Sequence, residues 1–229
     1  MQKKDHPQPD EHGHAEKHPK QDFQVERIAF FSDAVFAIAI TLLVIEFRVP
    51  LVTKDTTYSE LWQQVVELKY KFFALLLSFA LIANYWMRHH LLFKYIHNYN
   101  RQIIVSNIIG LLPMIFFPFT TSFFSENSNN KEILIIPYRL FILNNIIAGV
   151  TAYYFYWTVI KRFKGMSYPM EKNDEQEFQS KLLVMTVSFF LIFIFSFFLS
   201  IDYSVIGILP MAFTALKKKY FNKVPKNKR

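Results

Sequence analysis

The chain has 229 residues, of which 52% are hydrophobic and 18% aromatic, with 26 phenylalanines and only 5 glycines. This composition is too apolar for an ordinary soluble domain of this size, and the absence of cysteine excludes disulfides and thiolate metal sites. The formal net charge of +8 would suit a nucleic-acid partner, but the positions of the charges favour a membrane protein instead.

Residues 1–22 form a polar segment with almost nothing to bury, so we expect a disordered tail. The segment lacks the apolar core of a secretory signal, and the first hydrophobic run is therefore expected to remain in the mature protein. Its histidines are His6, His12, His14 and His18. Their irregular spacing is a weak signal for a metal, and we predict neither a metal site nor a cofactor for the chain.

Six aliphatic and aromatic runs follow, and several reach the ~20 residues that a helix needs to cross a bilayer. Lipid leaves backbone amides without an outside partner, and the runs lack the alternation of barrel strands, so each is predicted to be a helix. They cover residues 28–47, 72–93, 102–124, 134–160, 181–200 and 203–217. The last could instead be a tight hairpin or a bent continuation of the fifth. We predict an all-α integral membrane protein, with a transmembrane domain over 23–217 and a basic tail over 218–229.

Residues 58–70, between the first two runs, also have a helical pattern, because Leu61, Val65 and Leu68 fall on one face. The pattern favours a short interfacial helix with Trp62 at the level of the lipid headgroups. We expect this helix to lead into the second membrane span.

The distribution of basic residues predicts the orientation of the chain. With six spans, the N-terminus, the connections between spans two and three and between spans four and five, and the C-terminus share one side of the membrane. That side carries 20 of the 26 lysines and arginines, and the other side carries 6. The positive-inside rule then places both termini in the cytoplasm. The basic tail is expected to attract anionic membrane lipids, and no nucleic-acid partner is expected.

The first span carries an ionisable residue, Asp33, at membrane depth, where a carboxyl group is costly and is normally kept for a reason. At ~100° per residue, Ile38, Leu42 and Ile45 fall at about 0°, 40° and −20° and form a narrow aliphatic stripe. Thr41 lies at about −60°, at the border of the stripe, and Asp33 at about −140°, on the far side. If the stripe faces a central axis, Asp33 therefore faces neighbouring helices. Periodicity by itself favours packing of the stripe against lipid or other helices.

Asp33 needs a polar partner within the membrane. The best candidates are Trp86, His89 and His90, near the end of the second span. Asn107 in the third span is a further option. Two interpretations stay open: a buried polar network that locks the helices together, which we favour, and a switch that titrates near neutral pH.

Several signatures of other functions are missing from the sequence. No TVGYG-like loop is present, so we expect no carbonyl selectivity filter of the usual potassium-channel type. The motifs HExxH and GxSxG and the Gly-rich phosphate loops are also absent. We predict that the protein is not an enzyme.

The first span opens with the motif RxxxFSD, which consists of Arg27, Phe31, Ser32 and Asp33. Followed by AVFAIAITLL, this motif resembles the first helix of the transmembrane protein 175 family of cation channels. The sequence Trp86-xx-His89-His90-x-Leu92-Phe93 resembles the end of the family's second helix. Asn107 and the region Pro118-Phe119-x-Thr121 resemble its third. The resemblance covers about half of the chain in motif and nearly all of it in hydropathy.

This resemblance implies a potassium-permeable cation channel of the bacterial or archaeal cell membrane. It implies six helices per subunit and a homotetramer around a pore lined by the first helix. The pore constriction maps onto Ile38, the further hydrophobic layers onto Leu42 and Ile45, and a polar layer onto Thr41. The structural network of the motif comprises Arg27, Phe31, Ser32, Asp33, Trp86, His89, His90 and Asn107. Ala37 stands where some members have serine, which leaves fewer polar groups at the constriction.

The favoured interpretation is a passive channel for potassium and other monovalent cations, with an aliphatic constriction in place of a carbonyl filter. One alternative is a proton-conducting channel or proton-coupled carrier that uses Asp33 with His89 or His90. Another is a structural membrane protein that conducts no ions.

Overall fold

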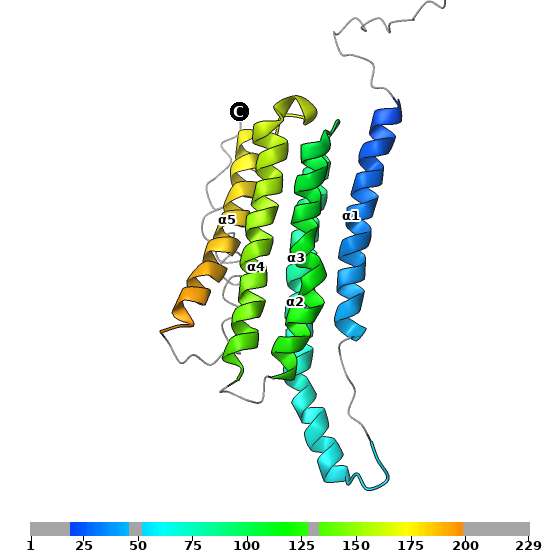
Figure 1. Ribbon diagram of the computed structural model, residues 1–229, viewed down its shortest axis with the longest axis vertical. Coiled ribbons are helices and arrows are strands. Elements are labelled where there is room, and N and C mark those ends of the chain that lie inside the picture. Colours follow the sequence, from blue (N-terminus) through cyan, green and yellow to red (C-terminus); the bar gives the residue numbers. More distant parts are fainter. Residues whose placement is uncertain (1–18, 46–51, 128–132, 199–229) are drawn as a thin grey trace, which may run out of the picture.

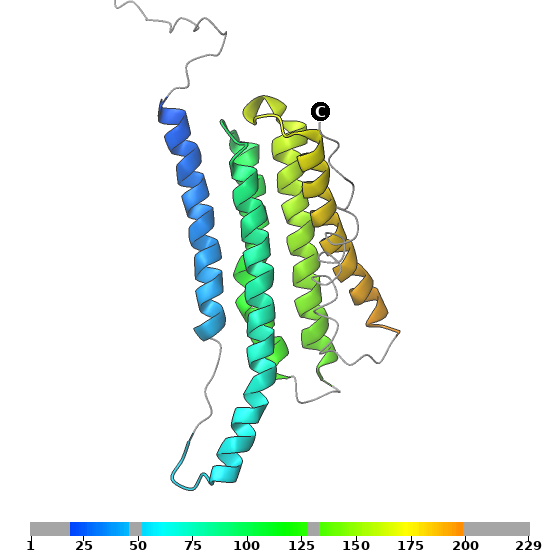
Figure 2. The same cartoon turned by 180° about the vertical axis from the view of Figure 1, so that it is seen from behind.

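The computed structural model describes residues 19–45, 52–127 and 133–198. These residues form the long helices α1 (Pro19–Ile45), α2 (Tyr58–Phe93), α3 (Arg101–Glu126), α4 (Ile135–Tyr156) and α5 (Lys172–Phe195). Successive helices run in opposite directions and form an up-and-down bundle (Figures 1 and 2). A π-helical turn, η1 (Trp157–Arg162), and a 3-10 turn, η2 (Lys164–Met166), lead from α4 towards α5.

Helix α3 lies at the centre of the packing, because it contacts α1, α2 and α4, while α5 packs against α4. Helix α1 stands at the edge of the bundle and packs against α2 and α3 (Figure 1). One apolar cluster joins Phe36 of α1 to Leu81 of α2 and Phe117 of α3. A second cluster includes Leu92 of α2 and Phe155 of α4. The edge position leaves one side of α1 without a partner among the described residues.

Side-chain caps explain where two of the helices begin. At the start of α2, the Thr57 hydroxyl accepts a hydrogen bond from the Glu60 backbone N–H at 3.3 Å. In return, the Glu60 carboxylate accepts one from the Thr57 N–H at 2.9 Å, which completes a capping box. At the start of α3, the Asn100 side chain accepts from the Ile103 N–H at 2.9 Å.

Four helices in the described part of the chain are long and apolar enough to cross a membrane. They are Phe23–Ile45, Arg101–Glu126, Ile135–Arg162 and Lys172–Phe195. Helix α2 is longer than any of these, but the second half of α2 carries Asn84, Arg88 and His89, which lower its hydropathy. Its first half projects beyond the neighbouring helices (Figures 1 and 2). The described part of the chain is thus helical in its regular structure, with several candidate membrane spans, as the sequence predicts.

The helix boundaries differ from the sequence-based expectation in three places. Helix α1 already begins at Pro19, so residues 19–22 are helical, and proline suits the first turn because its missing N–H would have no partner there. Residues 58–70 are the first part of α2 and do not form a separate interfacial helix. Helix α5 begins at Lys172, nine residues before the apolar run, with Asp174 and Glu175 in its first turn. The sixth run, 203–217, and the tail 218–229 lie outside the described residues.

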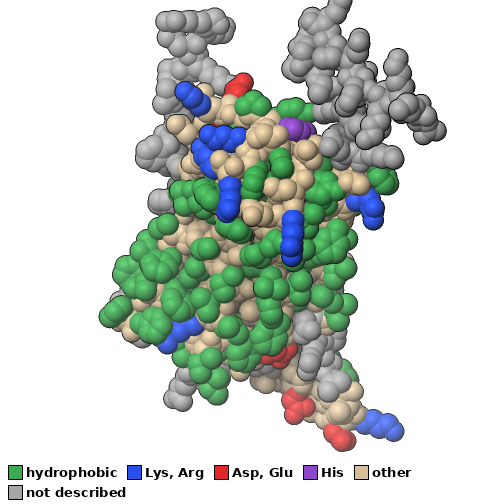
Figure 3. All heavy atoms as spheres, turned by 45° about the horizontal axis from the view of Figure 1, so that its top comes forward, with side chains coloured by type: hydrophobic (Ala, Val, Ile, Leu, Met, Phe, Trp, Pro, Cys, Tyr) green, Lys and Arg blue, Asp and Glu red, His purple; other side chains and the backbone are tan. Residues whose placement is uncertain are grey.

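Basic side chains gather at one end of the bundle, where α1 begins and where the α2–α3 and α4–α5 connections lie (Figure 3). They include Lys94, Arg101, Lys161, Arg162 and Lys164. The two connections are joined by backbone hydrogen bonds, from the Tyr168 N–H to the Tyr95 carbonyl at 2.7 Å and from the His97 N–H to the Met166 carbonyl at 3.1 Å. This basic end is the one that the sequence predicts to face the cytoplasm.

Candidate functional site

One narrow face of helix α1, which we call the seam, packs against the rest of the chain. Ser32, Phe36, Ala39 and Leu43 are all buried, and their spacing of four, three and four residues keeps them on one face. Phe36, Ala39 and Leu43 belong to the apolar cluster shared with α2 and α3. This seam fixes which side of α1 faces its own subunit.

The aliphatic stripe of α1 lies on a different face, away from the seam. Ile38 is 57% exposed, Leu42 37% and Ile45 72%, so their own chain leaves much of each side chain uncovered. Thr41 is also exposed, and its hydroxyl donates a hydrogen bond to the Ile38 carbonyl at 2.9 Å. Because the single hydroxyl proton is used in this bond, the lone pairs of the Thr41 oxygen remain free to accept.

A buried polar network joins the seam of α1 to α2 and α3. Ser32 donates to the Ile28 carbonyl at 2.9 Å and accepts from the Asn107 amide at 2.9 Å. The amide oxygen of Asn107 lies 2.7 Å from Nε2 of His89. Since that oxygen can only accept, His89 carries its proton on Nε2 in this arrangement. We call these three residues, Ser32, Asn107 and His89, the polar network.

The carboxylate of Asp33 is bound by tryptophan in this structure. The indole Nε1–H of Trp86 donates to Oδ1 of Asp33 at 2.8 Å. The ring of His90 lies 5.6 Å from that of Trp86, measured between centroids. His89 instead packs among aromatic rings, with Phe36 at 5.3 Å and Phe155 at 5.2 Å. Asp33 and His89 therefore belong to two adjacent sets of contacts, and neither histidine makes a hydrogen bond to Asp33 among those of the described residues.

The remaining motif residues lie outside these contacts. Phe31 is 56% exposed, and Arg27 is also exposed. Arg27 takes part in none of the side-chain hydrogen bonds or ion pairs found within residues 19–45, 52–127 and 133–198. Both side chains thus point away from the subunit core, on the edge helix.

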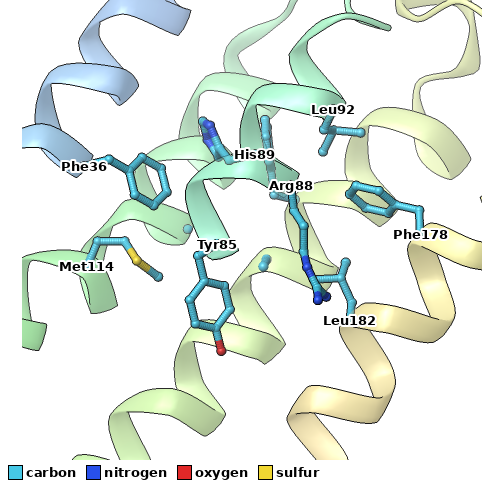
Figure 4. A pocket seen from close by; sticks show the side chains of 11 residues that line it. Phe36, Tyr85, Arg88, His89, Leu92, Met114, Phe178 and Leu182 are labelled. Carbon is cyan, nitrogen blue, oxygen red and sulfur yellow. The ribbon is translucent and has the colours of Figure 1, made fainter. Parts of the chain in front are cut away.

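Arg88 of α2 was missed by the sequence interpretation. Its guanidinium reaches between Tyr85 and Leu182, towards α5 (Figure 4). Its Nη1 atom is buried and has no hydrogen-bond partner in the described structure. The signal was present in the sequence, because an arginine within a membrane span marks a functional site by default.

Comparisons with known proteins find similar sequences over most of the first three helices. The family model described as the endosomal/lysosomal potassium channel TMEM175 matches residues 27–118. A potassium channel of Streptomyces collinus is 33% identical over 100 residues, which cover 44% of this chain and 47% of that protein. A potassium channel of Chamaesiphon minutus is 37% identical over 108 residues, or 47% of this chain and 52% of that protein. The chain thus matches only about half the length of these relatives.

A solved structure is similar over most of the chain. It is the crystal structure of a lysosomal potassium-selective channel TMEM175 homologue from Chamaesiphon minutus, with a TM-score of 0.68 and 23% identity. The match covers 85% of this chain and 98% of that one. At this identity the likeness shows a shared fold. Residues 27–118, which hold the RxxxFSD motif and its contacts on α2 and α3, match the model of the transmembrane protein 175 family.

Proposed function

We propose that the protein is a passive, potassium-permeable cation channel in which several copies of the chain surround one pore lined by α1. The observation that carries this proposal is the uncovered aliphatic stripe of Ile38, Leu42 and Ile45 on a helix at the edge of its own bundle. Four subunits, each with six spans of which 203–217 is the sixth, are what the resemblance to the family implies. Potassium as the permeant ion agrees with the names of the relatives.

The helix geometry supports a layered pore. Along the helix axis, Leu42 lies about 6 Å beyond Ile38, and Ile45 lies about 10 Å beyond Ile38. Each residue therefore supplies one ring when copies of α1 meet. A narrow apolar ring excludes ions by dewetting, and it conducts only when it widens or rotates away. The Thr41 oxygen, with its lone pairs free, would supply a polar layer between the first two rings.

The contacts behind α1 have a positioning role in this proposal. Ser32 and Asp33 are held by Asn107 and Trp86, from two different helices. Two anchors on adjacent residues fix both the height and the rotation of α1, and thereby the direction of the stripe. Asp33 then acts on the pore through the orientation of its helix and does not bind the permeant ion.

We further propose the orientation and location that the sequence predicts. The basic end of the bundle faces the cytoplasm, with both chain termini on that side, in a bacterial or archaeal cell membrane. The gathering of lysine and arginine side chains at that end supports this orientation (Figure 3).

Potassium flux into liposomes tests the constriction. Ile38→Asn places a polar amide in the narrowest ring, so we expect a higher flux and weaker discrimination between potassium and sodium. Val44→Asn is the matched control, because Val44 is similarly exposed, at 62%, but lies off the stripe. We expect the control to conduct like the parent. No change with Ile38→Asn, or an equal change with both variants, would remove Ile38 from the constriction.

The same liposomes separate this channel from its alternatives. With opposed potassium and pH gradients, the reversal potential should follow potassium. A potential that follows the pH gradient would support proton conduction through Asp33 and the histidines. Complete absence of cation flux in the purified protein would support a structural role.

A further inference from the structure

A cleft of about 600 Å³ separates α2 from α5 near the basic end of the bundle. Asn84, Arg88 and Leu91 of α2 line one side, and Asp174, Glu177 and Lys181 of α5 line the other. The volume falls in the range of pockets that hold small organic ligands. Neither the RxxxFSD motif nor the stripe of α1 contributes to this cleft.

Two polar atoms that line the cleft lack partners. Nη1 of Arg88 and Oδ1 of Asn84 are buried and make no hydrogen bond in the described structure. Arg88 extends from α2 towards Leu182 of α5, so its charged group crosses the space between the two helices (Figure 4). An unpaired guanidinium at membrane depth is costly, which implies that a bound group of opposite charge completes the site.

The two unpaired charges of the cleft lie at different distances from the helix ends. Asp174 is two residues from the start of α5, about 3 Å from its end, and Arg88 is five residues from the end of α2, about 8 Å deep. Glu177 and Lys181 pair with each other on α5 at 2.5 Å. None of the ion pairs between described residues involves Arg88 or Asp174. Counted from these helix ends, the unpaired positive charge of Arg88 therefore lies deeper than the unpaired negative charge of Asp174.

We propose that this cleft binds one phospholipid with a primary-amine headgroup, phosphatidylethanolamine. Its phosphate lies deeper than its ammonium when the lipid sits in a bilayer, which matches Arg88 below and Asp174 above. Met87 and Leu91, which are 55% and 40% exposed, offer an apolar surface to the acyl chains. A lipid with only a phosphate charge would satisfy Arg88 but leave Asp174 at the mouth without a cation, and a quaternary amine could not donate hydrogen bonds to it.

Native mass spectrometry of the purified, delipidated protein tests the site. The protein is titrated with phosphatidylethanolamine, phosphatidylcholine or phosphatidylglycerol. We expect one phosphatidylethanolamine per chain, held about tenfold more tightly than either of the others, since the ammonium–carboxylate contact is charge-assisted. Equal binding of the three lipids, or no stoichiometric binding at all, would overturn the proposal. The second result is expected if water or another protein segment fills the cleft.

Substitutions on the two sides of the cleft test the phosphate contact and the ammonium contact separately. Arg88→Gln should lower the affinity for the lipid by about tenfold or more, because the phosphate loses its guanidinium partner. Asp174→Asn should keep phospholipid binding and lose the preference for the amine. Lys94→Gln, an exposed change at the same end of α2 but outside the cleft, is the control. Melting temperatures establish that the variants fold, and parent-like lipid binding by a folded Arg88→Gln would refute the site. None of these results depends on ion conduction.

Discussion

Asn107 is the residue through which α1, α2 and α3 are joined, and its replacement by leucine tests the polar network. Leucine has a similar volume, so the change removes the hydrogen bonds without opening a large cavity. Ser32 keeps its bond to the Ile28 carbonyl. His89 has no second acceptor, because its Nε2–H bonds only to Asn107 and would be left buried without a partner.

These contacts set the expected loss of stability. A buried donor left without a partner costs about 1–3 kcal/mol. An interhelical hydrogen bond in a membrane protein averages about 0.6 kcal/mol, which is the value to add for the lost Ser32–Asn107 bond. We expect Asn107→Leu to lose roughly 2–3 kcal/mol of unfolding free energy, a shift of about thirtyfold to 150-fold in the folding equilibrium.

Reversible unfolding of the detergent-solubilised protein measures this loss. Asn84→Leu is the matched control, since it makes the same change on α2 at an amide whose oxygen has no partner. We expect the control to lose less than about 0.5 kcal/mol. Equal losses in the two variants would show that the hydrogen bonds of Asn107 do not hold α1 in place.

Further predictions concern the other contacts. Trp86→Phe removes the donor to Asp33 and should cost about 1.5–3 kcal/mol in the same assay, whereas Trp62→Phe, at an exposed site, should change little. Gly149→Ala should destabilise the α4–α5 contact by about 1–3 kcal/mol, because the added methyl would lie 2.9 Å from Cβ of Thr186. Gly110→Ala, where the nearest atom is 3.9 Å away, should be tolerated, and similar melting temperatures for the two glycine variants would contradict the close approach. The Thr57 N–H holds the pKa of the Glu60 carboxyl below its ordinary value, so the capping box contributes fully above that ordinary pKa and is lost as pH falls through the lowered one. The protection of amides in the first turn of α2, measured relative to their intrinsic exchange rates, should therefore fall at acidic pH, and Glu60→Gln, which removes the titrating group, should abolish this pH dependence.

The sequence was sufficient for the features that depend on periodicity and hydropathy. The 3.6-residue repeat separates Ile38, Leu42 and Ile45 from Asp33 by angle alone, and the structure also has the stripe uncovered and Asp33 turned towards α2. Hydropathy located the apolar core of each described helix. Its limits are clearest at α5, where polar residues from Lys172 onward continue the helix because they are good helix formers with acidic side chains at the positive end.

Contacts between helices could not be predicted from one sequence. Four residues on α2 and α3 were available to Asp33, and only the rotation of α2 decides that Trp86 reaches it while His89 turns to Asn107. Arg88 lies between Trp86 and His89 in the sequence, yet it points to α5 (Figure 4). Three residues within one turn of α2 thus contact three different helices. Only the tertiary packing decides which residue contacts which helix.

The central proposal is that the stripe of α1 faces a conducting pore, and the absence of cysteine from the chain allows a direct test. Ile38→Cys and Val44→Cys each introduce a single thiol, which is treated with a cationic methanethiosulfonate reagent during current recording. We predict that modification blocks or strongly reduces the potassium current of Ile38→Cys and leaves that of Val44→Cys unchanged. An unaltered current in Ile38→Cys, with complete labelling of the thiol shown by mass spectrometry, would contradict a pore lined by this face of α1.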